Sequence, residues 1–222
     1  MATFAEQILQ FYETLNPPDV PASAGVLDPY STPEVQRVMR QFFTRYFNDI
    51  HTRIFLIGIN PGRFGSGITG IGFTDPLALS EDCGIKHTLG TGTELSARFV
   101  YQLIRRMGGP ESFYRHVYIT ALSPYGFVRN GKNLNFYDDP DLESAVTPFI
   151  EATLREQISF GAKPRAIIVG TGKNFKRAQA INQRLGLFDE LVPLAHPRYI
   201  MQYKRKQLDA YLDEYVSTLS QL

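Results

Sequence analysis

The sequence predicts an α/β protein, a three-layer α/β/α sandwich with a central four-stranded parallel sheet. Four short apolar runs are well separated along the chain, and turn formers or polar residues bound each of them, as is typical of buried parallel strands. Segments with helical spacing lie between these runs, and strands that alternate with helices form parallel sheets covered on both faces. No repeat or linker divides the chain, so we expect one domain over residues 1–222.

The first 50 residues predict two helices that pack on the α/β core. Apolar side chains recur at helical spacing over residues 4–15, and four prolines within residues 16–31 predict a loop. A second helix begins at Ser31, where a capping side chain, an early proline and a first-turn acid follow one another. Its apolar face continues to Phe47.

The rest of the chain predicts the sheet and its covering helices. The expected strands are Ile54–Ile59, Val117–Leu122, Ala166–Val169 and Leu191–Ala195. The expected helices are Glu94–Met107, Leu142–Ser159, Asn174–Leu185 and a last one from Lys204 to Leu219. Ligands of such sheets bind beyond the carboxyl ends of the strands. We therefore expect the site in the segments that follow the strands, which are Gly58–Phe73, Ala121–Leu134, Gly170–Lys173 and His196–Lys206.

Composition excludes several classes of protein. Hydrophobic residues make up 43% of the chain and charged residues 20%, which is typical of globular rather than disordered proteins. A single cysteine, Cys83, excludes an internal disulfide framework and a four-cysteine metal site. No apolar run approaches the roughly 20 residues that cross a bilayer, and the N-terminus has no basic segment typical of a secretory signal. We expect an intracellular protein that does not enter membranes.

The net charge of +1 hides an uneven distribution of charge. Residues 155–206 carry 11 Lys and Arg against 3 Asp and Glu. A basic block of this kind is typical of proteins that bind a polyanion, although solvated helix faces produce the same pattern. Tyrosines alternate with basic residues after His196, which favours a nucleic acid that offers both phosphates and bases.

The first predicted strand runs into a glycine-rich segment, Gly58–Phe73. Its six glycines allow the backbone to approach a ligand closely. Gly65–Gly70 matches G-x-G-x-x-G, but it lies well beyond the strand and lacks a helix start, so we do not infer a nucleotide cofactor. Asp75 and Asp82 flank this segment and could act as a base, but we expect both to be solvated.

Two polar residues that follow strands can carry chemistry. The Asn60 carboxamide can orient a water molecule by accepting and donating hydrogen bonds at once. His196, held by Pro197, can donate a hydrogen bond to a developing anion. The alternatives are a polar turn residue and a structural histidine. Gly170–Asn174 lacks the P-loop pattern, but it can meet a phosphate at the start of a basic helix.

Together these motifs resemble the uracil-DNA glycosylase superfamily, in particular its single-strand-selective monofunctional (SMUG-type) branch. The first motif of that branch, G-M-N-P-G-P-F-G followed by T-G-x-x-F, is similar to Gly58–Gly65 and Thr69–Phe73. His196-Pro197 resembles the start of its second motif. The similarity also includes Glu94–Phe99, Leu122–Pro124, Gly131–Leu134 and Val169–Gly172.

The resemblance implies a glycosylase that turns a deaminated base out of DNA and hydrolyses its N-glycosidic bond without a lyase step. We expect single- or double-stranded DNA as the partner, no metal or other cofactor, and a monomer. Two alternatives remain. One is a DNA-binding module of the same fold that has lost its chemistry, and the other is a hydrolase of free nucleosides or nucleotides.

The resemblance also implies residue roles. Asn60 would position water, Phe73 would stack on the flipped base, and His196 would stabilise the departing base. The remaining expected base-pocket residues are Ile59, Gly62, Phe64 and Ala121. The expected DNA contacts are Gly131, Lys132, Asn133, Lys173, Arg198, Tyr199 and Lys204.

Two departures from the family pattern bear on the substrate. Ala121 stands where the family reads uracil with an asparagine, and alanine cannot pair with a base edge. Arg198 directly follows Pro197, so the predicted DNA wedge is shorter than the family's H-P-S-P-R-N segment. We therefore expect a pocket that accepts deaminated purines such as xanthine or hypoxanthine as well as uracil.

Overall fold

A computed structural model describes residues 1–222. Its central sheet consists of four parallel strands in the order β3-β2-β6-β7. Their bounds are β2 (Arg53–Gly58), β3 (Val117–Ala121), β6 (Ala162–Val169) and β7 (Glu190–Leu194). Every residue of β2 is buried, as expected for a central strand covered on both faces. The predicted four-stranded parallel sheet is confirmed.

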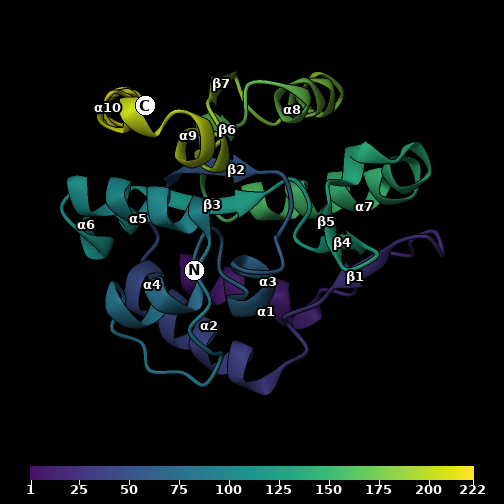
Figure 1. Ribbon diagram of the computed structural model, residues 1–222, viewed down its shortest axis with the longest axis horizontal. Helices are drawn as coiled ribbons and strands as arrows, with labels where there is room; N and C mark the ends of the chain where they lie inside the picture. The colour runs from purple at the N-terminus through teal and green to yellow at the C-terminus, as the bar shows by residue number, and fades with distance from the viewer.

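Helices cover both faces of the sheet, so the predicted α/β/α sandwich is also confirmed. Figure 1 shows α5 (Leu95–Arg106) and α10 (Leu208–Gln221) on one side, and α7 (Pro140–Ile158) and α8 (Lys173–Leu185) on the other. Phe99 of α5 packs edge-on against Tyr215 of α10, with ring centroids 5.1 Å apart.

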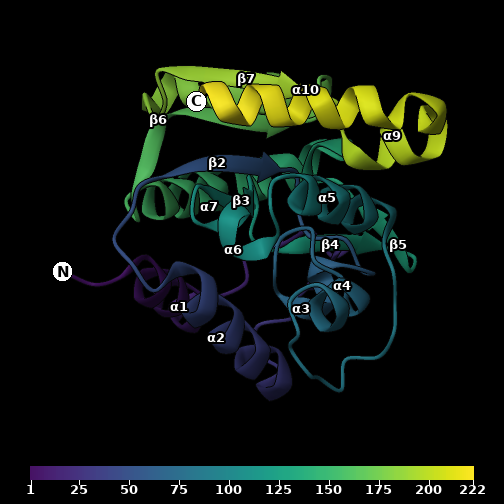
Figure 2. The same ribbon diagram turned by 90° about the vertical axis from the view of Figure 1, so that its left-hand side faces the viewer.

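The N-terminal helices α1 (Phe4–Thr14) and α2 (Pro33–Phe47) lie beside the β3 edge of the sheet (Figures 1 and 2). Phe4 is fully buried, and its ring centroid lies 5.8 Å from that of Phe47 and 5.3 Å from that of Tyr118. Arg53, also fully buried, holds this corner together: its guanidinium bonds both carboxylate oxygens of Asp49, at 2.9 and 2.7 Å.

A second, three-stranded antiparallel sheet was not predicted. Its order is β1-β4-β5, with β1 (Gly25–Leu27), β4 (Gly126–Arg129) and β5 (Lys132–Leu134). The expectation of an unbroken loop over residues 16–31 is therefore wrong, because β1 pairs with β4. Asn130 and Gly131 join β4 to β5 with φ of 49° and 70°, as a two-residue hairpin turn requires.

The C-terminal helix begins later than predicted. A separate helix, α9 (Pro197–Tyr203), directly follows the residue His196, and α10 starts only at Leu208. The cause is local: His196 caps α9, and Pro197 occupies its first turn, where a missing N–H costs nothing. The remaining short helices are α3 (Ser66–Thr69), α4 (Pro76–Glu81), α6 (Pro110–Tyr114), η1 (Phe136–Asp138) and η2 (Arg205–Gln207).

None of these helices combines the length and the apolar character that a bilayer crossing needs.

Candidate active site

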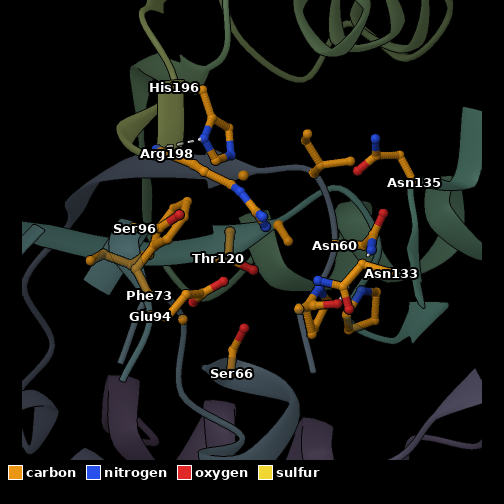
Figure 3. A pocket seen from close by; sticks show the side chains of 18 of the residues that line it. Asn60, Ser66, Phe73, Glu94, Ser96, Thr120, Asn133, Asn135, His196 and Arg198 are labelled. Carbon is orange, nitrogen blue, oxygen red and sulfur yellow. Dashed lines mark hydrogen bonds between the residues drawn. The ribbon is translucent and has the colours of Figure 1, made fainter. Parts of the chain in front are cut away.

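A cavity of about 460 Å³ opens at the carboxyl ends of β2 and β3 (Figure 3). Gly58–Gly62 of the glycine-rich segment and Ile119–Ala121 of β3 form part of its wall, and His196 and Arg198 contribute from the start of α9. Asn60 and His196 therefore line the same cavity, although they follow different strands. Figure 3 shows His196, Phe73 and Glu94 toward one side and Asn60 toward the other.

The Asn60 side chain is held by the second sheet. Its Nδ2 donates to the carbonyl oxygens of Leu134 and Pro61, each at 3.3 Å, and its Oδ1 accepts from the N–H of Phe136 at 3.3 Å. Both N–H groups are thus used within the protein, while Oδ1 keeps one free lone pair. The amide is therefore placed to accept from a water molecule through Oδ1, and the expected donation from Nδ2 to that water stays a prediction.

The hydrogen bonding of His196 determines where its proton lies. The backbone N–H of Arg198 donates to Nδ1 at 3.1 Å, so the neutral ring carries its hydrogen on Nε2. Burial and, to a smaller extent, the positive charge of Arg198 lower the pKa of His196 to about 4. The imidazole is therefore neutral at physiological pH and presents a single N–H donor.

Phe73 lies next to this imidazole. The two rings meet edge to face, with centroids 6.0 Å apart and planes at 71°. Phe73 has a φ of 48°, which is unusual for a residue with a bulky side chain. The Thr69 hydroxyl holds this turn, because it donates to the carbonyl of Thr74 at 2.6 Å and accepts from the N–H of Ile71 at 3.2 Å. An added Cβ at Gly58 would lie 3.3 Å from the Phe73 ring, so glycine leaves the ring room.

Glu94 also lines the cavity, although no pattern in the sequence predicts a role for it. The pKa of its carboxyl group is raised to about 7. Burial is the main cause, the positive charge of Arg198 opposes the rise, and the negative charge of Asp75 adds to it. Asp75 itself is only 2% exposed and accepts from the N–H of Ala78 at 2.8 Å and of Glu94 at 2.7 Å. The expectation that Asp75 is solvated is therefore wrong. The same expectation is wrong for Asp82, because its two carboxylate oxygens accept from the guanidinium of Arg105 at 2.7 and 2.8 Å.

Most of the residues expected in the base pocket or at the DNA line this one cavity, and some do not. Those at the cavity are Ile59, Asn60, Gly62, Phe73, Ala121, Asn133, His196, Arg198 and Tyr199. Those outside it are Phe64, Gly131, Lys132, Lys173 and Lys204.

The residues outside the cavity lie on the nearby surface. Phe64 is 49% exposed, and the Arg63 guanidinium lies 4.4 Å from its ring centroid, so the structure does not support its placement in the base pocket. Lys173, at the start of α8, lies 3.8 Å from an oxygen of Asp138. Tyr203, one of the tyrosines that alternate with basic residues after His196, also lines the cavity.

The fold and this cavity together define a DNA glycosylase, a hydrolase that acts on N-glycosyl bonds. Residues 44–220 match the Uracil DNA glycosylase superfamily, and the chain belongs to it. Among solved structures, the chain is similar to the crystal structure of wild-type Pedobacter heparinus SMUG2, with 37% identity and a TM-score of 0.95 over 99% of this chain and 98% of that one. The predicted SMUG-type membership is confirmed. No match was found among proteins with curated descriptions.

The family assigns the chain to uracil-DNA glycosylase-type repair, in which a damaged base is removed from DNA.

Proposed function

We propose that this glycosylase removes uracil and the deaminated purines xanthine and hypoxanthine from DNA, by base flipping and hydrolysis and without cutting the strand. The observation that carries this proposal is the placement of the neutral His196 imidazole. Its single N–H is on Nε2, and its ring lies edge to face with the ring of Phe73 within one cavity.

A flipped base that stacks on Phe73 places its carbonyl edge near the Nε2–H of His196. The bond between C1′ of the sugar and the base nitrogen then breaks, and its electron pair stays on the base. His196 donates to the carbonyl oxygen where the negative charge gathers, which in comparable oxyanion sites contributes on the order of 3 kcal/mol. A neutral donor suits this role because it stabilises charge that appears only in the transition state.

Asn60 supports the second half of the reaction. The free lone pair of its Oδ1 accepts a hydrogen bond from water, whose oxygen adds to C1′; one proton of this water leaves to solvent, and the other stays on the new hydroxyl group. The carbonyls of Leu134 and Pro61 hold the amide in place, so the water site is preorganised.

The shape of the cavity supports the acceptance of purines. Ala121, the last residue of β3, lines the cavity with a methyl group where the family pattern has an asparagine. The volume of about 460 Å³ lies within the range of small-molecule sites, about 300–1,000 Å³. We therefore propose that the pocket admits a two-ring base.

The residues around the cavity also support a hydrolytic reaction without a lyase step. None of the residues that line it is a lysine. A strand-cutting step through a Schiff base needs an amine within reach of C1′. Water is therefore the nucleophile that we propose.

The rim of the cavity is suited to DNA. Tyr199 and Tyr203 of α9 are 45% and 67% exposed, and their ring centroids lie 5.7 Å apart. Exposed aromatic rings beside basic side chains are typical of surfaces that stack on bases and follow a phosphate backbone. Arg198 and Lys204 belong to the same helix or its end. We propose that this face holds the nucleotides on either side of the flipped one.

The direct test is base release from oligonucleotides that carry one uracil, xanthine or hypoxanthine, in single- and double-stranded form. We expect release of all three and intact strands until alkali is added. The Ala121→Asn variant should shift the ratio of rates toward uracil, because a carboxamide pairs with its edge and narrows the pocket.

Ala210→Asn is the matched control, because Ala210 is exposed on α10 and lies outside the cavity. No release from any substrate would refute the proposed function. An unchanged base profile in Ala121→Asn would show that this residue does not limit the choice of base.

A further inference from the structure

The carboxyl group of Glu94 lies in the wall of the cavity, and the reaction proposed above gives it no role. Glu94 is the N-cap residue of α5, yet its side chain makes no capping hydrogen bond. Neither carboxyl oxygen has a hydrogen-bond partner in the protein, whereas the backbone N–H of Glu94 is fixed by Asp75 at 2.7 Å. Figure 3 shows the carboxyl group next to Phe73, on the same side of the cavity as His196.

The glycine-rich segment leaves room for this carboxyl group. An added Cβ at Gly65 would overlap Oε2 of Glu94, and one at Gly62 would lie 3.0 Å from Oε1. Any side chain at Gly65 would therefore push the carboxyl group away. The glycines that bring the backbone close to the ligand also allow an acid to reach the cavity.

We propose that Glu94 is a base-recognition residue whose carboxyl group pairs with the carbonyl and N–H edge of the flipped base. This inference rests on the proposed function. A protonated carboxyl group donates through its O–H and accepts through its carbonyl oxygen, as a carboxamide does through N–H and C=O. Glu94 thus supplies the donor and acceptor pair that Ala121 lacks, from a different wall of the same cavity.

The charged and titratable groups around Glu94 support a neutral carboxyl group in the free enzyme. Asp75, at the start of α4, is a second acid beside it, and the neutral His196 faces it from the start of α9. Arg198 of α9 is the cation whose charge acts on Glu94, and the two side chains form no ion pair. The pKa of Glu94 is raised to about 7 in these surroundings.

Ionisation of Glu94 would weaken the reaction in two ways. The carboxylate could no longer donate to a base carbonyl, and its charge would oppose the negative charge that gathers on the departing base. The activity that depends on Glu94 should therefore be nearly full at pH 6, half lost at the pKa of about 7, and lost as the pH rises further.

The test is kcat/KM for uracil release between pH 5.5 and 8.5. For the wild type we expect kcat/KM to fall above about pH 7, by about tenfold for each further pH unit. Glu94→Gln should keep the wild-type rate at pH 6 and lose this fall, because glutamine retains a donor and an acceptor without titrating. Glu94→Ala should be about tenfold slower at pH 6, as expected for the loss of one base contact.

Glu156→Gln, on the exposed surface of α7, is the matched control and should keep the wild-type profile. Thermal unfolding of each variant separates a loss of folding from a loss of recognition. A wild-type rate in Glu94→Ala, or a fall above pH 7 that persists in Glu94→Gln, would overturn this inference and leave the glycosylase reaction intact. A wild type that releases no base would overturn the proposed function and this inference with it.

Discussion

A single backbone contact sets the tautomer of His196. The Arg198 N–H occupies Nδ1 at 3.1 Å, which directs the only ring proton to Nε2 and fixes the imidazole at the end of β7. Burial keeps the ring neutral. The same contact begins α9, so the residue that starts a helix is also the donor in the cavity.

His196→Ala should lower kcat for uracil release by about 100-fold or more, with little change in KM, because the lost hydrogen bond acts on charge that develops in the transition state. Single-turnover kinetics at pH 7 measure this change. His116→Ala is the matched control, since His116 lies outside the cavity. If His196→Ala and His116→Ala changed kcat and KM to the same extent, the role proposed for His196 would be contradicted.

At the scale of elements, α9 carries the exposed aromatic rings at the mouth of the cavity. Tyr199 and Tyr203 lie one helical turn apart, and neither hydroxyl has a hydrogen-bond partner within the protein. Rings that are this exposed contribute little to a folded core, so their placement favours contact with a ligand.

Tyr199→Ala and Tyr203→Ala should each weaken binding of single-stranded DNA by about 1–3 kcal/mol, the usual contribution of base stacking on an aromatic ring. Fluorescence anisotropy with a labelled oligonucleotide measures this change. The phenylalanine variants are the controls, and they should bind as the wild type does. A larger loss in the phenylalanine than in the alanine variants would contradict stacking.

Elements that are buried on both faces could be predicted from the sequence, and short ones could not. The apolar run Ile54–Ile59 lies within one residue of β2 because a central parallel strand is apolar on both faces. β1 and β5 have three residues each and are partly exposed, so they are too short to show an alternation of apolar and polar residues. Asn130-Gly131, a strong hairpin signal, was the available indication of β4 and β5.

In the site, too, some residues could be predicted from the sequence and others could not. Asn60 and His196 follow strands, so the rule for parallel sheets places both at one edge of the sheet. Glu94 belongs to a segment of the resemblance, but its place in the cavity could not be predicted, because it depends on Asp75 and on glycines about 30 residues earlier, and no local pattern reveals that proximity. The α9 helix was missed because a histidine is not a usual cap, although the proline after it was a signal.

At the scale of the whole molecule, Arg53 joins the N-terminal helices to the sheet. Its guanidinium is fully buried and lies 4.6 Å from the ring centroid of Phe4 and 4.8 Å from that of Phe47. It also donates to the carbonyl of Tyr114 at 2.8 Å, in addition to both oxygens of Asp49. One side chain thus connects α1, α2, β2 and α6.

Arg53→Met should lower the free energy of unfolding by about 3–5 kcal/mol, because it leaves Asp49 and buried carbonyls without their partner. Urea unfolding measures this loss. Arg40→Met, which breaks an exposed pair with Glu13, is the control and should cost at most about 1 kcal/mol. The activity per folded molecule should not change in either variant, and a loss in Arg53→Met would mean that this corner communicates with the cavity.

The two carbonyls that hold the Asn60 amide restrict which residue can occupy this position. An aspartate would be a stronger base toward water, but it would set an oxygen opposite Leu134 and Pro61, where only an N–H fits. An amide at this position therefore offers water a fixed acceptor rather than a strong base. The backbone carbonyl of Leu134, at the end of β5, and that of Pro61, after β2, thus select an amide over a carboxylate at this position.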